Sequence, residues 1–365
     1  MHKVNLAENI YYVGFNDRKT HLFENIWPIP KGVSYNSYLI VDEKIALIDT
    51  VERSYIDDYL DQIAVLTEGR PVDYLVINHM EPDHSGALKA VISRYPDITL
   101  VGNKKTFEMA SNFYQVTQKS IEVYDDSELS LGKTNLQFTT IPMVHWPETM
   151  VTFESTNKIL FTGDACGSYG TLDGGIFDDE LDYTQYDEEI VRYFSNIVGK
   201  YCAHTQRALK KIAKYDIKMI AATHGMIWRS HIDFILDKYN KLSTYQTDPG
   251  AVIVYGSMYG NTAKMAEIIA RATAQAQGLA RYFTGVACKH GHLAERYTAS
   301  KTCCECGNAT ANKSKSKDRA RYSAQAVEWG KQNPERRAQH QRTQNAKRPG
   351  KRNLWTMNYR TAKAA

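Results

Sequence analysis

The chain has 365 residues, of which 43% are hydrophobic, and a formal net charge of +4. Its length suffices for two or three domains, and no run of about 18 apolar residues predicts a transmembrane helix. The first residues lack the apolar stretch of a signal peptide, so we expect a cytoplasmic protein that does not span a membrane.

Charge and cysteine are unevenly distributed along the chain. From residue 275 on, 19 Lys and Arg residues stand against 5 Asp and Glu, whereas residues 1–274 contain 26 basic and 36 acidic residues. Two cysteines lie in the acidic part, and four cluster in the basic part: Cys166 and Cys202, then Cys288, Cys303, Cys304 and Cys306. This division predicts two unrelated modules, and clustered cysteines in a cytoplasmic chain favour a metal site over disulfides.

Strands and helices are predicted to alternate through the acidic part. Apolar periodicity and β-branched residues indicate, in chain order, two strands within 35–50, a helix at 54–67, a strand at 72–78, a helix at 86–94, a strand at 98–101, a helix at 104–113, strands at 121–124, 136–141, 149–154 and 158–162, helices at 186–198 and 204–215, and a strand at 217–223. This order predicts a layered α/β body.

The most informative motif is His79-Met80-Glu81-Pro82-Asp83-His84, which directly follows the strand predicted at 72–78. Alternate residues of an extended segment face one side, so His79, Glu81 and Asp83 can converge there. The His84 side chain can face the same side, where the chain enters the next helix. Charged groups at such buried positions persist only when they are paired or bind metal.

Three further candidate ligands follow later predicted strands, namely His145, Asp164 and His224. The seven side chains exceed the four that a single tetrahedral metal needs, so they fit two ions. Asp164 is the best bridging ligand because each of its oxygens can bind one ion. Carboxylates mixed with imidazoles suit iron or manganese. Cys166, two residues past Asp164, is expected to face away.

These motifs resemble the metallo-β-lactamase superfamily, whose His-x-His-x-Asp-His loop here has Glu81 at its second histidine. That substitution, with the segments around His145, Asp164 and His224, is similar to flavodiiron proteins (A-type flavoproteins) over about residues 3–274. The resemblance implies an αββα sandwich. It assigns one iron to His79, Glu81, His145 and Asp164, and the other to Asp83, His84, Asp164 and His224. It also implies reduction of O2 to water or NO to nitrous oxide, with FMN, a donor such as rubredoxin and a head-to-tail homodimer. Tyr193 is a candidate donor near the gas site, although an ordinary helix residue is the simpler interpretation.

A second fingerprint begins after a linker predicted at 243–250. A strand is predicted over 251–257, then a loop and a helix over 261–274. The loop residues resemble the FMN-phosphate loop of flavodoxins: Ser257, Met258, Tyr259, Gly260, Asn261 and Thr262. A flavodoxin-like domain needs five parallel strands, and no later βαβ pattern occurs. We therefore expect an incomplete flavodoxin-like start that binds FMN weakly or not at all.

The basic tail has too few apolar residues for a large core. Cys288, His292, Cys303 and Cys306 are spaced as in a zinc knuckle, and the segment resembles the small zinc module of phage-type HNH endonucleases. Basic and aromatic residues that could contact nucleic acid follow: Arg319, Arg321, Tyr322, Trp329, Arg336, Arg337, Arg342, Lys347, Arg348, Lys351, Arg352, Trp355 and Tyr359.

The sequence thus predicts a metallo-β-lactamase-like di-iron domain over 1–247, a truncated flavodoxin-like segment over 251–274 and a basic tail over 275–365. Three functions remain open. The first is di-iron reduction of O2 or NO. The second is hydrolysis by two zinc ions on the same fold, and the third is nucleic-acid binding through the tail.

Overall fold

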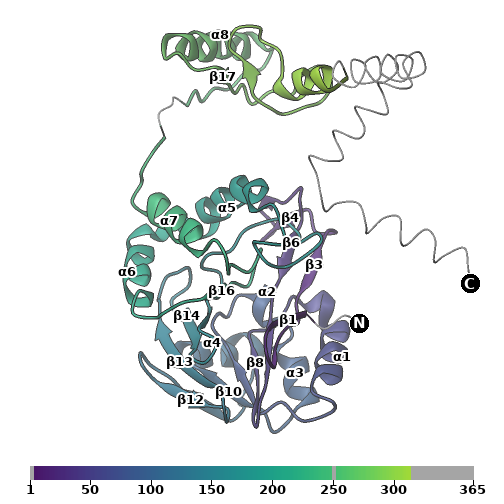
Figure 1. The fold of residues 1–365 in the computed structure, drawn as a ribbon, viewed down its shortest axis with the longest axis vertical. Helices are drawn as coiled ribbons and strands as arrows, with labels where there is room; N and C mark the ends of the chain where they lie inside the picture. The colour runs from purple at the N-terminus through teal and green to yellow at the C-terminus, as the bar shows by residue number, and fades with distance from the viewer. Residues whose placement is uncertain (1–3, 249–251, 314–365) are drawn as a thin grey trace, which may run out of the picture. The chain divides into compact units, whose positions relative to one another are not determined.

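A computed structural model describes residues 4–248 and 252–313. They belong to two compact units, the first of which ends at Asp248 (Figure 1). The basic and aromatic residues that are candidates for nucleic-acid contact, from Arg319 to Tyr359, lie outside the described part. None of the helices in the described ranges is long and apolar enough to cross a membrane.

The first unit contains a mixed seven-stranded sheet. Its strands, in spatial order, are β1 (Val4–Ala7), β2 (Ile10–Tyr12), β7 (Tyr38–Val41), β8 (Ile45–Ile48), β9 (Tyr74–Val76), β10 (Thr99–Gly102) and β11 (Ser120–Glu122). The pairs from β1 to β8 are antiparallel and those from β8 to β11 are parallel. All four residues of β8 are buried, as expected of a central strand covered on both faces.

A five-stranded sheet shares the same hydrophobic core. It runs in the order β12 (Glu128–Ser130), β13 (Asn135–Thr140), β14 (Met150–Glu154), β15 (Ile159–Phe161) and β16 (Met219–Ala221). Because β14 is antiparallel to both β13 and β15, and β16 is parallel to β15, the strands β13, β15 and β16 share one direction. Their carboxyl ends therefore open at one edge of the sheet.

Helices cover the outer faces of the two sheets. The α-helices of the unit are α1 (Ile56–Leu66), α2 (Pro82–Ser85), α3 (Leu88–Arg94), α4 (Lys104–Tyr114), α5 (Asp187–Tyr193), which continues as a π-helix at Phe194–Val198, α6 (Cys202–Ile212) and α7 (Ile232–Ser243). In Figure 1, α1 and α3 lie on one flank of the unit, and α6 and α7 on the opposite one. This arrangement confirms the predicted αββα sandwich.

Several short strands were not predicted from the sequence. They include β1 and β2 and two pairs, β3 (Phe15–Asp17) with β6 (Val33–Tyr35) and β4 (Leu22–Phe23) with β5 (Trp27–Pro28). Each has only two to four residues. Segments of this length give almost no periodicity, so their pairing depends on the body against which they pack.

The second unit contains α8 (Asn261–Ala276), a two-stranded sheet of β17 (Arg281–Tyr282) and β18 (Arg296–Tyr297), and a helical segment at 304–313. The predicted helix is present, but the strand predicted over 251–257 was wrong: residues 252–257 form no strand. Val252 and Val254 are 90% and 91% exposed. A parallel strand is stable only beside neighbouring strands, and among the described residues of this unit no strand pairs with 252–257.

Candidate metal centre

All seven predicted ligands follow the carboxyl ends of strands, five in loops and two, Asp83 and His84, in the short helix α2. The His79–His84 loop follows β9, and His145, Asp164 and His224 follow β13, β15 and β16. Since the last three strands run in the same direction, their loops meet at one edge of the five-stranded sheet. The two sheets pack on one core, which brings the loop after β9 to the same place.

The structure divides these side chains into two groups. The ligand atoms within each group all lie within 4.8 Å of one another: His79, Glu81, His145 and Asp164 in one, and Asp83, His84 and His224 in the other. Six of the seven residues are buried, and the Asp83 side chain is 14% exposed. Each group thus offers a mixture of imidazole nitrogens and carboxylate oxygens to one point.

Asp164 lies between the two groups. Its Oδ2 is 3.0 Å from His145 Nε2 and 3.5 Å from His79 Nε2. Its Oδ1 is 2.9 Å from His84 Nε2 and 3.7 Å from His224 Nε2. One carboxylate therefore directs one oxygen to each group, which is the geometry that a bridging ligand requires.

Several ligand atoms are buried without a hydrogen-bond partner in the described chain. They are both carboxylate oxygens of Asp83, both ring nitrogens of His84, and Nε2 of His224. His224 Nε2 and His84 Nε2 lie only 3.2 and 3.4 Å from Asp83 Oδ2, yet neither contact has hydrogen-bond geometry. Buried polar atoms normally have a partner, and a metal cation between them would supply it. The residues present therefore fit a second metal ion beside the first.

The buried carboxylates of the site need positive charge close to them. Burial alone would lower the histidine pKa values, but Asp83 and Asp164 raise the pKa of His84 to about 9. Hydrogen bonds to Asp164 and Glu81 likewise raise the pKa of His145 to about 9. Burial raises the pKa of Asp164, but the surrounding histidines hold it well below its usual range. The buried carboxylates are thus stabilised by cations, a role that bound metal ions also fill.

Two acceptors that the sequence did not reveal fix the orientation of histidine rings. Glu148 Oε1 lies 2.8 Å from His79 Nδ1 and also accepts the Met80 N–H at 2.9 Å. The backbone carbonyl of Ser34 lies 2.7 Å from His224 Nδ1. In both rings Nδ1 is thereby occupied and Nε2 faces the site, as is usual for metal-binding histidines. The position of Glu148, three residues after His145, was the one available clue.

Hydrogen bonds hold the ligand loops in place. Thr223 Oγ1 donates to Asp164 Oδ1 at 2.7 Å, so the bridging side chain is fixed from the adjacent strand end. Asp49, at the end of β8, accepts the backbone N–H groups of Asn78 and His79 at 2.7 and 3.2 Å. These contacts make the geometry of the site a property of the folded chain before any metal binds.

Aromatic rings surround the His224 side of the centre. Ring centroids of Phe23, Tyr35 and Tyr193 lie 5.2, 5.7 and 5.5 Å from that of His224. Tyr193 is fully buried, and its hydroxyl has no hydrogen-bond partner in the described residues. Cys166 belongs to neither ligand group: it is buried, and burial raises the pKa of its thiol to about 12. Aromatic rings thus form this side of the site, and the Tyr193 hydroxyl is a donor without a partner in the described residues.

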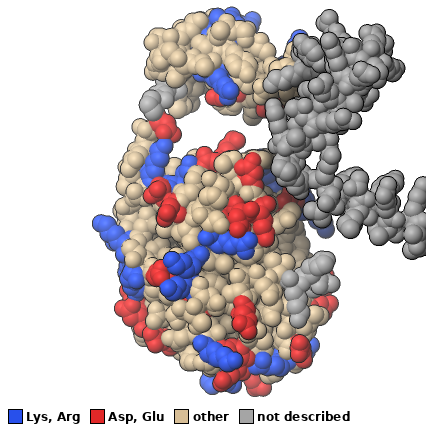
Figure 2. Space-filling view, viewed as in Figure 1, with Lys and Arg blue, Asp and Glu red and all other residues tan. Residues whose placement is uncertain are grey.

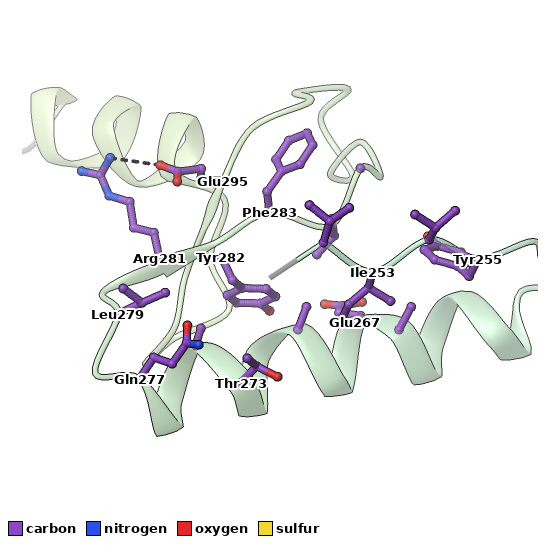
Figure 3. A pocket seen from close by; sticks show the side chains of 17 residues that line it. Ile253, Tyr255, Glu267, Thr273, Gln277, Leu279, Arg281, Tyr282, Phe283 and Glu295 are labelled. Atoms are coloured by element: carbon purple, nitrogen blue, oxygen red, sulfur yellow. Dashed lines mark hydrogen bonds and ion pairs between the residues drawn. The ribbon is translucent and has the colours of Figure 1, made fainter. Parts of the chain in front are cut away.

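The flavin fingerprint retains only its turn and helix. Gly260 has φ +81°, a value at which a side chain would be strained, and Ser257 Oγ accepts the Ala263 N–H at 3.3 Å. A cavity of about 700 Å³ lies in the same unit (Figure 3), between residues 252–255, α8 and β17. None of the six fingerprint residues lines it.

The four predicted tail ligands also converge. Cys288, His292, Cys303 and Cys306 form a third group whose ligand atoms lie within 4.8 Å of one another. Cys304, which lies between two of them in sequence, is not part of it. This group belongs to the second unit and is separate from the two groups that share Asp164.

Comparisons with known proteins agree with this geometry. The profile of the ODP family of β-lactamase-like domains matches residues 33–225. A nitric oxide reductase of Moorella thermoacetica is 32% identical over 73% of this chain and 67% of its own length. An anaerobic nitric oxide reductase flavorubredoxin of Vibrio vulnificus is 31% identical over 73% of this chain, which spans only 55% of that protein.

Solved structures show the same likeness. The flavodiiron protein of Giardia intestinalis superposes with a TM-score of 0.73 and 29% identity, over 76% of this chain and 68% of its own. The rubredoxin:oxygen oxidoreductase of Desulfovibrio gigas gives a TM-score of 0.72 and 29% identity, over 76% of this chain and 70% of its own. The chain therefore belongs to the ODP family of β-lactamase-like proteins and, within it, to the flavodiiron proteins.

Proposed function

We propose that the first unit reduces O2 to water, NO to nitrous oxide, or both, at a di-iron centre. The observation that carries this proposal is Asp164, which directs one carboxylate oxygen to each of two ligand groups. The names of the relatives support both substrates, since one is a nitric oxide reductase and another a rubredoxin:oxygen oxidoreductase.

We assign His79, Glu81, His145 and Asp164 to one iron, and Asp83, His84, Asp164 and His224 to the other. When bound, two reduced irons would supply two electrons and binding positions for small gaseous ligands. Two electrons convert two NO to nitrous oxide and water, whereas O2 to water takes four, of which the donor would supply the other two. The chain supplies the positioning. Thr223 fixes the bridging carboxylate, Glu148 fixes the His79 ring, and the rings around His224 limit the access of water.

The electron route is part of the proposal. A donor such as rubredoxin would feed the centre of a head-to-tail homodimer. In the family one subunit's flavin faces the other's irons, but because we expect little FMN on this chain, the donor would have to reduce the irons without that flavin. The face seen in Figure 2 carries Lys and Arg side chains interspersed with Asp and Glu over the first unit, without one dominant sign. Donor docking by this face would therefore depend on local charge pairs, which salt screens.

We expect the purified full chain to retain FMN far below one molecule per chain. Only the phosphate turn and α8 are formed, residues 252–257 are not in a sheet, and the neighbouring cavity lacks the fingerprint residues. Phosphate contacts alone leave the isoalloxazine ring without a pocket. Flavin absorbance after denaturation, compared with protein concentration, gives the ratio. One tightly held FMN per chain after dialysis against flavin-free buffer would contradict this expectation.

Metal exchange separates the proposed function from zinc hydrolysis. The chain is freed of metal with a chelator and reloaded anaerobically with Fe(II) or Zn(II) at equal ratios. With a chemical reductant as donor, we expect the iron form to consume O2 or NO catalytically and the zinc form to be inactive. A zinc form that hydrolyses esters or phosphodiesters, beside an iron form that reduces neither gas, would favour the hydrolase instead.

A further inference from the structure

We propose that Cys288, His292, Cys303 and Cys306 bind one zinc ion that holds the second unit together, independently of the iron centre. The four ligand atoms come from two turns separated by β18 and converge on one point. No oxygen donor belongs to this group, whereas the iron centre has no sulfur donor. The two sites therefore differ in ligand chemistry, and thiolates with imidazole favour zinc.

The spacing of the ligand atoms matches a tetrahedral zinc site. Bonds of about 2.3 Å to sulfur and about 2.0 Å to nitrogen put tetrahedral ligands about 3.8 Å apart for two sulfurs and about 3.5 Å apart for sulfur and nitrogen. Cys288 and Cys306 Sγ are 3.7 Å apart. The distances from His292 Nδ1 to the sulfurs of Cys288, Cys303 and Cys306 are 3.6, 3.9 and 3.3 Å. A disulfide would instead need sulfurs about 2.05 Å apart.

The first turn is shaped to present its ligands. The Cys288 N–H donates to the His292 carbonyl at 2.9 Å, and the Gly291 N–H donates to the Cys288 carbonyl at 2.8 Å. The turn closes through Gly291 at φ +84°, where other residues would be strained. The His290 N–H points to Cys288 Sγ at 3.4 Å, and such a donor stabilises a thiolate. The turn thus holds Cys288 and His292 on one side.

The second turn opens a helix. Cys303 pairs with Arg296 of β18 through an isolated β-bridge, residues 304–313 are helical, and the Gly307 N–H donates to the Cys303 carbonyl at 2.9 Å. Residues three positions apart in a helical turn face the same side, so Cys303 and Cys306 point together. Cys304, one position on, is buried without joining the group.

The second unit has little else to stabilise it. Its buried side chains among residues 252–313 are Ala266, Ala274, Tyr282, Thr298, Cys303 and Cys304. Larger apolar side chains such as Ile268 and Phe283 are 67% and 54% exposed. So small a core rarely holds a domain by itself, and small proteins commonly add a metal for this purpose. A zinc ion here would tie both turns to the β17–β18 pair.

Cobalt substitution in the full chain tests this site selectively. Since the iron centre contains no cysteine, only the tail group can give thiolate-to-cobalt charge-transfer bands with intense tetrahedral d–d bands. We expect these bands, with the intensity of one thiolate-bound Co(II) per chain, in the wild type and in Cys304→Ser, and their loss in Cys288→Ser and Cys306→Ser. Zinc should displace the cobalt and bleach the bands. A wild type without such bands, or a Cys306→Ser variant with unchanged bands, would overturn the proposal.

Thiol labelling gives a readout that does not depend on the variants folding. In the wild-type chain with zinc, Cys288, Cys303 and Cys306 should react with an alkylating reagent at least ten times more slowly than after chelation. Cys202 of the first unit is the internal control, because it is buried in α6 outside both ligand groups, and it should not respond to the chelator. Equal labelling with and without zinc, or recovery of Cys288 and Cys306 as a disulfide from freshly purified protein, would contradict zinc binding.

Discussion

Replacing Asp164 by asparagine is expected to lower the iron content from two ions per chain to one or fewer, and the turnover by roughly 100-fold or more. Even the loss of a residue that only hydrogen-bonds to a metal ligand typically lowers metal affinity or activity by about 10- to 100-fold. Oδ2 of Asp164 lies 3.0 Å from His145 Nε2 and Oδ1 lies 2.9 Å from His84 Nε2. An amide offers only one good donor atom and no negative charge. At least one ligand group therefore loses its bond to residue 164, and the negative charge between the two groups is lost.

Iron per chain after anaerobic loading and gel filtration, together with gas consumption at saturating reductant, measures this effect. Asp173→Asn is the matched control because that carboxylate is 71% exposed and pairs with Arg18 at the surface. We expect the control to retain two irons and normal turnover. An Asp164→Asn protein that keeps two irons and more than half of its turnover would refute the bridging role.

Replacing Glu148 by leucine is expected to weaken iron binding by roughly 10- to 100-fold, although Glu148 touches no predicted iron position. Its Oε1 fixes Nδ1 of His79 and accepts the Met80 N–H. Leucine leaves both groups buried without an acceptor, at a cost of about 1–3 kcal/mol each in the free energy of unfolding. Glu148→Gln keeps an acceptor oxygen, so its effect should be clearly smaller.

The control for Glu148 is Glu154→Leu. Glu154 is also fully buried, and its oxygens accept the N–H groups of Thr156 and Asn157 at 2.7 and 2.8 Å, away from the ligands. We expect both leucine variants to lose stability in chemical denaturation, but only Glu148→Leu to lose iron affinity in competition with a chelator. Equal affinities in the two variants would show that Glu148 does not orient His79.

Much of the candidate site could be predicted because its ligands are adjacent in sequence or follow strands. The His79–His84 segment has four potential ligands in six residues, which is too dense for an ordinary loop. Asp164 and His224 could be placed because strands of one direction end at one edge of a sheet. The segments that lead into these loops, 72–78, 136–141, 158–162 and 217–223, are rich in apolar and β-branched residues, so their order as strands was predictable although the strands themselves are short.

The remaining features depend on contacts that no local pattern encodes. Glu148 and Thr223 resemble any other polar loop residues until the two sheets pack and bring them to His79 and Asp164. The wrong strand prediction at 251–257 has the opposite cause, because here the local pattern is strong and the contacts are missing. Those residues have strong strand propensity, but a strand also needs partners, and the described part of the second unit has none to pair with them.

Mössbauer spectroscopy of the full chain loaded with 57Fe tests the central claim most directly. If Asp164 bridges two irons, the oxidised protein should contain two iron ions per chain, and their spins should be antiferromagnetically coupled, so that both give quadrupole doublets without magnetic splitting in a weak applied field. One iron per chain, or two magnetically isolated high-spin ferric ions, would contradict a shared carboxylate. Asp164→Asn measured in the same way should lose the coupled spectrum.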